Sequence, residues 1–482
     1  MEKSNKSTAS ATRRDFIKQG VAAAAGFMVV PRHVLGGTGF TAPSDKLVIG
    51  GIGVGGKGES DLSSFHESGK AEIACLCDVD DRRAAISVNR FPKAKYYKDF
   101  REMLDKEHKH IDAVSVSGPD HNHAIHALSA MQLGKHVYVQ KPLAHDVYEA
   151  RVLTKAAKKY KVVTQMGNQG SSGDGVRVMR EWFDSGLIGD VDTVYCWTDR
   201  PVWPQGIQWP TQVAAVPKEL EWDLWLGTAP YIHYIDKLVP FNWRGWWDYG
   251  TGALGDMGCH IMEAPFSILG LQYVKDVHAS VGTVYADGFQ RAYFPRSCPP
   301  SSYAVLTFPK TKKTPGDIKI HWMDGGIQPQ RPDELGANES FGDGGNGILF
   351  VGTKGKMLAD LFGENPRLLP ASRAAETTGV PQRYKRVPNG IPGHYAQWVE
   401  AAIAGYGNME VSSPFEIAGP LTEALLMANL AIRGADLRID GKYPGKNLKL
   451  IWDNNNMKVT NFDEVNQFVK RQYRRGWELP KI

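Results

Sequence analysis

Two short stretches of this sequence contain the residue types that nucleotide binding and proton transfer require. Residues 46–58 (KLVIGGIGVGGKG) have the pattern of an apolar strand, a glycine-rich turn and the start of a helix. Residues 136–142 (HVYVQKP) place Lys141 directly after a second apolar strand. Because doubly wound sheets bind ligands at the carboxyl ends of their strands, the two stretches together indicate nicotinamide-dependent chemistry.

The glycine pattern G-x-G-x-x-G fits the turn in two registers, 51/53/56 and 53/55/58. We prefer Gly53, Gly55 and Gly58, because the strand then runs directly into the turn. Asp78 follows Gly58 by 20 residues, at the end of the next predicted strand, where a carboxylate can bind the ribose hydroxyls. Such a carboxylate repels a 2′-phosphate, so the expected cofactor is NAD. An arginine at 82 or 83 could weaken that preference.

Strands and helices alternate over the first part of the chain. The apolar strands are predicted at 46–52, 71–77, 113–117, 137–139 and 162–164, and the helices at 59–67, 81–89, 121–133 and 147–160. Alternating units with nearly continuous apolar strands predict a parallel, doubly wound sheet. The fold class is therefore α/β, with an N-terminal Rossmann domain at residues 44–167.

The pattern changes after residue 168, where glycine, proline and aromatic residues become more frequent. Longer strands with alternating polarity are predicted at 191–198, 303–308 and 317–323, and a glycine-rich loop at 325–347. They predict a C-terminal α+β domain at residues 168–440, built on a large, mostly antiparallel sheet with one open face. Residues 413–416 (SPFE) read as a capping box that opens a helix ending at Gly434, with a kink at Pro420. Residues 441–482 form a C-terminal extension.

Composition limits the possible classes of protein. Hydrophobic residues make up 42% and charged residues 23% of the 482 residues, which allows a large core. A net charge of +5 with scattered basic residues gives no reason to expect a nucleic-acid partner. Cys75 and Cys77 would point to the same face of one strand, which suits packing better than a disulfide or a metal site.

The first 36 residues have the pattern of an export signal. Arg13 and Arg14 precede an apolar run at 21–30 that is too short to span a bilayer. The paired arginines resemble a twin-arginine signal, which directs folded proteins to the periplasm; an ordinary N-terminal helix is the alternative. We identify no membrane span elsewhere in the chain.

Asp256 and His260 are the strongest acid–base candidates. On a helix, residues four apart share one face, so the carboxylate could orient the imidazole or bind substrate, and the imidazole could take a hydroxyl proton. A structural His–Asp pair is the alternative. His121, His123 and His126 lie close in sequence, but no carboxylate or cysteine joins them at ligand spacing, so no metal is expected.

Several motifs resemble the Gfo/Idh/MocA oxidoreductases over residues 44–440. The matching segments are 117–123 (SGPDHNH), 134–137 (GKHV), 140–144 (QKPLA), 185–191 (SGLIGDV) and 255–260 (GDMGCH). Gln140 stands where this family has a glutamate. The segments TDRP at 198–201 and WRGWWD at 243–248 look most like the exported branch of the family.

The resemblance implies roles for particular residues. Lys141 matches the lysine that contacts the substrate hydroxyl near the nicotinamide, and Asp256 and His260 match the acidic residue and the catalytic histidine. Ser117, Pro119 and His123 are then expected at the cofactor, together with the three glycines, Asp78 and Lys141.

Nine of the 13 tryptophans lie between 182 and 247, a clustering that can line a carbohydrate cleft as well as pack a core. The candidate sugar contacts are Trp197, Arg200, Trp243, Arg244 and Trp247. His321 and His394 are candidates for the cleft, although His394 fits better as an anchor of the helix that it opens.

These observations predict an NAD(H)-dependent oxidoreductase that transfers hydride from a secondary hydroxyl of a sugar, glycoside or cyclitol. One alternative is an NAD-dependent glycoside hydrolase that works by transient oxidation and elimination. Another is a non-catalytic sugar- or nucleotide-binding protein. The open sheet face is expected to form a homo-oligomer, a dimer or a tetramer.

Overall fold

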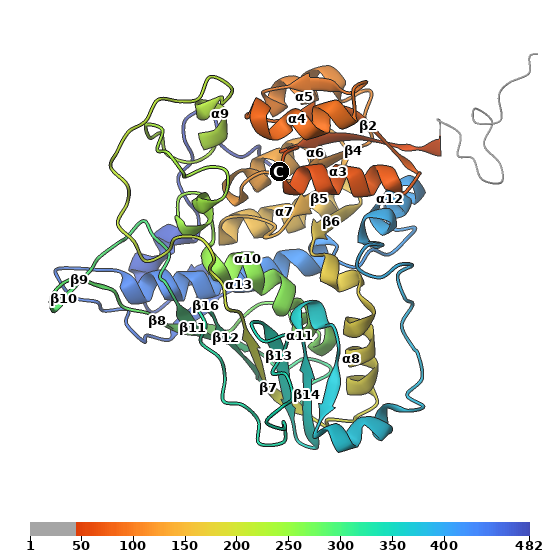
Figure 1. Cartoon of the computed structure of the whole chain (residues 1–482), viewed down its shortest axis with the longest axis vertical. Helices are drawn as coiled ribbons and strands as arrows, with labels where there is room; N and C mark the ends of the chain where they lie inside the picture. Colours follow the sequence, from red (N-terminus) through yellow and green to blue (C-terminus); the bar gives the residue numbers. More distant parts are fainter. Residues whose placement is uncertain (1–44) are drawn as a thin grey trace, which may run out of the picture. The chain divides into compact units, whose positions relative to one another are not determined.

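In the computed structural model, which describes residues 45–482, six strands form the first sheet (Figure 1). All neighbours pair in parallel, in the order β3-β2-β1-β4-β5-β6. The strands are β1 (Leu47–Ile52), β2 (Ala71–Cys77), β3 (Lys95–Tyr97), β4 (Ala113–Val116), β5 (His136–Gln140) and β6 (Thr164–Gly167). The strand order reverses between β1 and β4, and ligands bind at such a reversal in doubly wound sheets. The predicted Rossmann sheet is confirmed.

Helices connect these strands: α3 (Lys57–Glu67), α4 (Asp81–Arg90), α5 (Phe100–Glu107), α6 (His123–Gln132) and α7 (Val147–Tyr160). Three begin at an aspartate whose side chain accepts a hydrogen bond from a backbone N–H of the first turn: Asp80 for α4, Asp99 for α5 and Asp146 for α7. The short strand β3 and helix α5 were not predicted, because β3 has three residues and is only partly buried.

The second sheet has nine strands within the described range, in the order β15-β14-β13-β7-β12-β11-β8-β16-β17. The pair β7–β12 is parallel and the other pairs are antiparallel, so the predicted mostly antiparallel sheet is confirmed. Its strands are β7 (Val191–Trp197), β8 (Asp276–Val281), β11 (Ser302–Phe308), β12 (Ile318–Met323), β13 (Gly347–Gly352), β14 (Gly355–Ala359), β15 (Arg367–Leu369), β16 (Leu450–Asp453) and β17 (Lys458–Val459). A separate hairpin joins β9 (Tyr285–Asp287) and β10 (Gln290–Arg291).

Helix α13 (Phe415–Asp436) lies between the two sheets in Figure 1 and packs against α7 on one side and β8 and β11 on the other. By length and composition it could cross a membrane, but 89% of its apolar window is buried inside the fold, so it is a core helix. The remaining helices are α8 (Asp174–Asp184), α9 (Trp222–Leu226), α10 (Gly252–Ile261), α11 (Glu263–Leu269) and α12 (His394–Ala404).

The start of α13 differs from the predicted capping box. Pro414, not Ser413, is the residue before the first helical position, and the Ser413 hydroxyl has no hydrogen-bond partner among the described residues. The helix continues through Pro420 as far as Asp436. The first helical residue has a partner outside the helix, since the Phe415 N–H donates to the Thr164 hydroxyl of β6 (3.1 Å).

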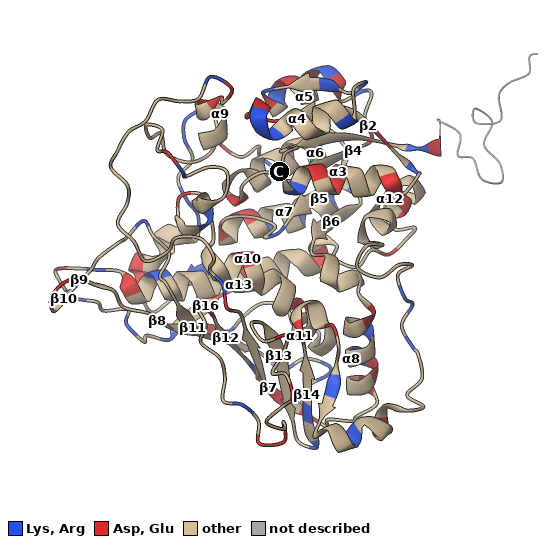
Figure 2. Cartoon of the chain, viewed as in Figure 1, with Lys and Arg blue, Asp and Glu red and all other residues tan. Residues whose placement is uncertain are grey.

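The C-terminal residues return to both halves of the chain. Strands β16 and β17 extend the second sheet beyond β8, and residues 471–482 run back to the first sheet. All five cysteines lie within the described range and are buried with free thiols, as expected for Cys75 and Cys77. The expected export signal, residues 1–36, lies outside the described residues. In the view of Figure 2, acidic and basic residues are interspersed over the helices and loops.

Candidate active site

The glycine-rich turn joins the end of β1 to the start of α3 and has no room for side chains. A Cβ atom at Gly53 would lie 2.5 Å from the backbone nitrogen of Gly118, and one at Gly58 would lie 1.8 Å from the carbonyl oxygen of Gly53. A Cβ atom at Gly55 would lie 2.6 Å from the Cβ of Arg83. Glycines at these positions let a pyrophosphate approach the helix N-terminus. This geometry fits the register 53/55/58.

Asp78 lies directly after β2, and its carboxylate is hydrogen-bonded to the turn. It accepts from the backbone N–H groups of Val54 (2.9 Å) and Gly55 (3.0 Å), and from that of Asp80 (3.0 Å). Burial raises the pKa of Asp78 to about 6, although the three backbone N–H groups oppose the rise. The carboxylate therefore shapes the turn, and its binding of ribose hydroxyls stays a prediction.

The two arginines of helix α4 next to this site lie differently. Arg82 is paired with Asp80, with 2.6 Å between its Nη2 and the carboxylate Oδ2. Arg83 borders the cavity described below and covers the turn, since a Cβ at Gly56 would lie 2.6 Å from its Nη2. Arg83 is thus the arginine placed to contact a phosphate.

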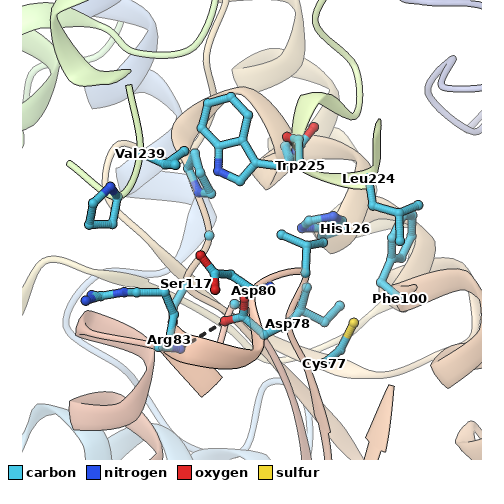
Figure 3. A pocket seen from close by; sticks show the side chains of 18 of the residues that line it. Cys77, Asp78, Asp80, Arg83, Phe100, Ser117, His126, Leu224, Trp225 and Val239 are labelled. Atoms are coloured by element: carbon cyan, nitrogen blue, oxygen red, sulfur yellow. Dashed lines mark hydrogen bonds between the residues drawn. The ribbon is translucent and has the colours of Figure 1, made fainter. Parts of the chain in front are cut away.

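A cavity of about 360 Å³ opens at the carboxyl ends of β1, β2 and β4 (Figure 3). In the view of Figure 3, Leu224, Phe100 and His126 lie together at one end and Arg83 lies toward the other. The predicted residues that line the cavity are Gly53, Gly55, Asp78, Ser117, Pro119, Trp243 and Arg244. Of the described residues predicted at the cofactor, Gly58, His123 and Lys141 lie outside this lining.

His123 has a structural position. Its two ring nitrogens lie 2.8 Å from the carbonyl oxygens of Pro142 and Gly118, so it ties the loop after β4 to the loop after β5. Ser117 donates from its hydroxyl to the buried carboxylate of Asp61 (2.8 Å). The two residues support the walls of the site.

The residues present fit a nicotinamide dinucleotide. The turn has glycines where neighbouring atoms approach the backbone closely, a carboxylate follows β2, and Arg83 lines the cavity. The cavity also carries an unsatisfied group, because the buried Nδ1 of His126 has no hydrogen-bond partner within residues 45–482. The phosphates would lie at the turn and the adenosine ribose at Asp78.

Lys141 follows β5 and forms the centre of a charged cluster. Its Nζ lies 2.8 Å from Oδ1 of Asp256 and 2.9 Å from the Asp256 carbonyl oxygen. The Nε of Arg244, which lines the cavity, lies 3.3 Å from the same Oδ1. Burial acts to raise the pKa of Asp256, but the charges of Lys141 and Arg244 outweigh burial and lower it to about 2. Asp256 is therefore ionised and holds both cations in place.

His260 lies one helical turn after Asp256 on α10, but its hydrogen bond goes elsewhere. Its Nδ1 lies 3.0 Å from the Oδ1 of Asn168, at the end of β6. Among the described residues, the hydrogen-bond partner that orients the ring is thus Asn168 rather than Asp256. Burial and the charge of Lys141 lower the pKa of His260 to about 3, although Asp256 opposes this. The imidazole is therefore neutral at neutral pH, and the ring nitrogen that does not contact Asn168 keeps its lone pair.

Gln140, which replaces the glutamate of the resembled family, has a clear partner. Its Nε2 donates to Oδ2 of Asp61 (2.8 Å), a carboxylate that is fully buried. The same carboxylate binds Lys57 (2.8 Å) and the hydroxyl of Tyr395 (3.0 Å). A glutamate at 140 would place a second carboxylate against Asp61, so the amide suits this chain.

The remaining sugar-contact candidates separate into two groups. Trp243 and Arg244 border the cavity, and the Arg244 guanidinium lies 4.4 Å from the Trp243 ring centre. Trp247 is 9% exposed and packs in the core, and Arg200 pairs with a neighbouring aspartate away from the cavity. Trp197 is fully buried, so its interpretation as a sugar contact is wrong. Four of the nine clustered tryptophans, Trp222, Trp225, Trp243 and Trp246, belong to a separate hydrophobic cluster of buried residues.

The other histidine candidates have structural partners. His394 begins α12 and is fully buried, with its ring between the Ser172 hydroxyl (2.7 Å) and the Met166 carbonyl oxygen (3.0 Å), which confirms its role as an anchor. His321 contacts the hydroxyl of Tyr303 (2.7 Å) on the second sheet. Within residues 45–482, no three side chains of the metal-binding types come together.

Asn168 and the aromatic side chains at one end of the cavity were not predicted from the sequence. Asn168 could have been found, because it follows a predicted strand at the same sheet edge as Lys141. Trp225 and Trp477 could not be found this way, since they reach the cavity from distant parts of the chain.

Comparisons with known proteins agree with this geometry. Residues 47–168 match the model of an oxidoreductase family, NAD-binding Rossmann fold, and residues 178–287 match the C-terminal alpha/beta domain of the same family. The chain is 33% identical over 171 residues to "Glycosyl hydrolase family 109 protein 1" of Shewanella sp. strain MR-4, covering 30% of this chain and 37% of that protein. It is 31% identical over 144 residues to an inositol 2-dehydrogenase/D-chiro-inositol 3-dehydrogenase of Lacticaseibacillus casei. This match covers 29% of this chain and 41% of that protein.

A longer match is the D-glucoside 3-dehydrogenase of Escherichia coli K12, at 24% identity over 320 residues, covering 64% of this chain and 78% of that protein. Among solved structures, levoglucosan dehydrogenase with NADH and levoglucosan shares the fold, with a TM-score of 0.53 and 15% identity. The match covers 80% of this chain and 98% of that chain. The chain spans less than half the length of the first relatives that it matches. The two domain matches show that the chain belongs to the Gfo/Idh/MocA family of oxidoreductases.

Proposed function

We propose that this protein is an NAD-dependent oxidoreductase acting on a secondary hydroxyl of a sugar, glycoside or cyclitol. The observation that carries the proposal is the cluster of Lys141, Asp256 and the neutral His260 at the carboxyl edge of an NAD-binding sheet. The related inositol and glucoside dehydrogenases support this class of substrate.

The residues of the cluster suit alcohol oxidation. Bound NAD supplies the hydride acceptor. The Lys141 ammonium, fixed by Asp256, holds the substrate oxygen and stabilises negative charge as the hydroxyl loses its proton. Since Nδ1 of neutral His260 donates to the Asn168 oxygen, its Nε2 keeps the lone pair that accepts the hydroxyl proton.

A second candidate function is glycoside hydrolysis through transient oxidation. It is supported by the similarity to the glycosyl hydrolase family 109 protein. In that reaction a ketone at one ring carbon acidifies the neighbouring proton, elimination expels the substituent, water adds, and the ketone is reduced again. The same Lys141 and His260 would serve both reactions.

A screen of glycosides, free sugars and cyclitols with the NAD-loaded protein distinguishes these functions. We expect a keto-product and reduced nicotinamide in equal amounts, detected by mass spectrometry and absorbance. Release of the leaving group without net reduction of the nicotinamide would support the glycoside hydrolase instead. Tight sugar binding with neither product would support a non-catalytic binding protein and reject the proposal.

The first prediction concerns cofactor choice. Replacing Asp78 by alanine should weaken NAD binding by about 1.5–3 kcal/mol, because a charge-assisted hydrogen bond to the ribose is lost. Asp78→Asn keeps an acceptor without the charge and should narrow the preference for NAD over NADP. Calorimetric titration of both dinucleotides measures this. Tighter binding of NADP than of NAD by the unchanged protein would reject the assignment.

We also propose that the protein is exported in its folded state to the periplasm, on the evidence of Arg13 and Arg14 before the apolar run. Changing both arginines to lysine should retain the protein in the cytoplasm, as measured by cell fractionation and immunoblotting. Lys18→Arg is the matched control, since it alters a basic residue outside the pair. Export that continues after the double change contradicts the twin-arginine interpretation.

A homo-oligomer through the second sheet is part of the same proposal. One face of its central strands carries partly exposed side chains at Thr193, Tyr195, Tyr303, Thr307 and His321. A second copy of the chain could cover this face. We expect a dimer or tetramer in sedimentation, and Tyr195→Arg should dissociate it. A monomer in the unchanged protein contradicts this proposal.

A further inference from the structure

We propose that two distant segments form a cover that encloses the adenosine half of the bound dinucleotide and slows its release. The cover consists of residues 219–228, which contain α9, and the C-terminal tail, residues 471–482. Trp477 is the tail residue that lines the cavity. This inference rests on the proposed function, because it concerns the same NAD site.

The position of the cover follows from the strand order. Lys141 follows β5, whereas Asp78 follows β2 and Phe100 begins the helix after β3. Because β2 and β3 lie on the opposite side of the β1–β4 reversal from β5, a dinucleotide with its nicotinamide at Lys141 places its adenosine near Asp78 and Phe100.

The cavity is apolar and aromatic at this end. Its walls there include Phe100, His126, Leu224, Trp225 and Trp477, of which all except Trp477 are labelled in Figure 3. Trp225 and Trp477 are 6% and 5% exposed. A flat, apolar base such as adenine fits walls of this kind.

The first segment of the cover is tied to the sheet edge. The Glu221 N–H donates to the carbonyl oxygen of Val79 (2.8 Å), and Glu219 accepts at its carbonyl oxygen from the Asp81 N–H (3.1 Å). At its other end, the Thr228 hydroxyl donates to the carbonyl oxygen of His121 (2.6 Å). These bonds hold Leu224 and Trp225 over the cavity.

The tail fastens this segment to the Rossmann domain. Arg474 pairs with Asp223 and donates to the carbonyl oxygen of Gly227 (3.0 Å). Arg471 pairs with the fully buried Glu149 of α7 (2.7 Å). In Figure 1, α9 and the end of the chain lie beside the helices of the first sheet.

Trp477 is held where it closes the cavity. The guanidinium of Arg101 lies 4.4 Å from its ring centre, and the Phe100 ring centre lies 6.2 Å away. Detachment of the tail would break the Arg474 contacts, expose Trp477 and open this end of the cavity. The cover therefore slows the exchange of the dinucleotide between the site and the solution.

The test measures cofactor release rather than turnover. Full-length protein is loaded with NADH, mixed with excess NAD, and followed by the loss of bound NADH fluorescence. Three variants weaken the cover: Trp477→Ala, Arg474→Ala and a chain that lacks residues 476–482 but keeps Arg471 and Arg474. We expect each to release NADH about tenfold to a hundredfold faster, the range that an aromatic contact to a base supports.

Trp452→Ala is the matched control, because Trp452 is similarly buried (7% exposed) but lies on β16 of the second sheet. It should release NADH at the full-length rate, and melting temperatures identify any variant that fails to fold. If the folded cover variants release NADH at the full-length rate, the proposed cover is wrong, and the proposed function is not affected. A full-length protein that binds neither NAD nor NADH overturns both.

Discussion

Replacing His260 by alanine is expected to reduce turnover about 10²–10⁴-fold, the usual cost of removing a positioned acid–base group. NAD binding should stay unchanged, because the glycine turn and Asp78 belong to the first sheet and its connections, whereas His260 lies on α10 and does not line the cavity. The ring is buried, neutral and oriented by Asn168, which is why its loss removes a base rather than a surface charge. Steady-state kinetics and NAD titration of the same preparation check both parts.

Lys141→Ala should lose turnover to a similar extent and also raise KM, because the ammonium holds the reacting hydroxyl. Asp256 would then keep Arg244 as its cationic partner. His278→Ala is the matched control, since His278 lies on β8 of the second sheet, away from the cluster. Near-normal turnover by His260→Ala would reject the assignment of His260 as the acid–base group.

The second large effect concerns the phosphate turn. A Cβ atom at Gly58 would lie 1.8 Å from the Gly53 carbonyl oxygen, so Gly58→Ala must displace the backbone of the turn. We expect the variant to be destabilised by about 1–3 kcal/mol, as for other overpacked sites, and to lose at least about tenfold in NAD affinity. Thermal unfolding and calorimetric titration measure the two effects.

The direction in which Gly58→Ala changes the stability of the protein is informative. Gly58 lies in the first turn of α3, and in an unconstrained helix alanine is more favourable than glycine by about 1 kcal/mol. Gly316→Ala is the control, because a Cβ there meets no atom within 4 Å. A Gly58→Ala variant that is more stable and binds NAD normally would show that the close approach does not constrain the turn.

The sequence predicted the first sheet well, because local patterns encode it. The strands β1 and β2 are nearly continuous apolar runs, and the glycines of the turn are needed by the backbone itself. The predicted strand 71–77 and helix 147–160 have the observed bounds. The strand β3 was not predicted, because three partly buried residues give no periodic pattern of hydrophobicity.

The site was predictable where it depends on one element and unpredictable where it depends on several. The position of Lys141 followed from the end of one predicted strand. The shared face of Asp256 and His260 followed from their spacing on one predicted helix. Which partners they contact depends on other elements, so the bonds from Asp256 to Arg244 and from His260 to Asn168 were not foreseen. Trp477 reaches the cavity from the far end of the chain, and spacing in the sequence carries no information about such a contact.

The most direct test of the account is hydride transfer itself. The NAD-loaded protein is mixed with a glycoside or cyclitol that carries deuterium on its ring carbons, and the cofactor is then released and weighed by mass spectrometry. The account predicts reduced nicotinamide that carries one deuterium, and little such product with His260→Ala. A substrate that binds and reacts while the cofactor gains no deuterium would contradict it.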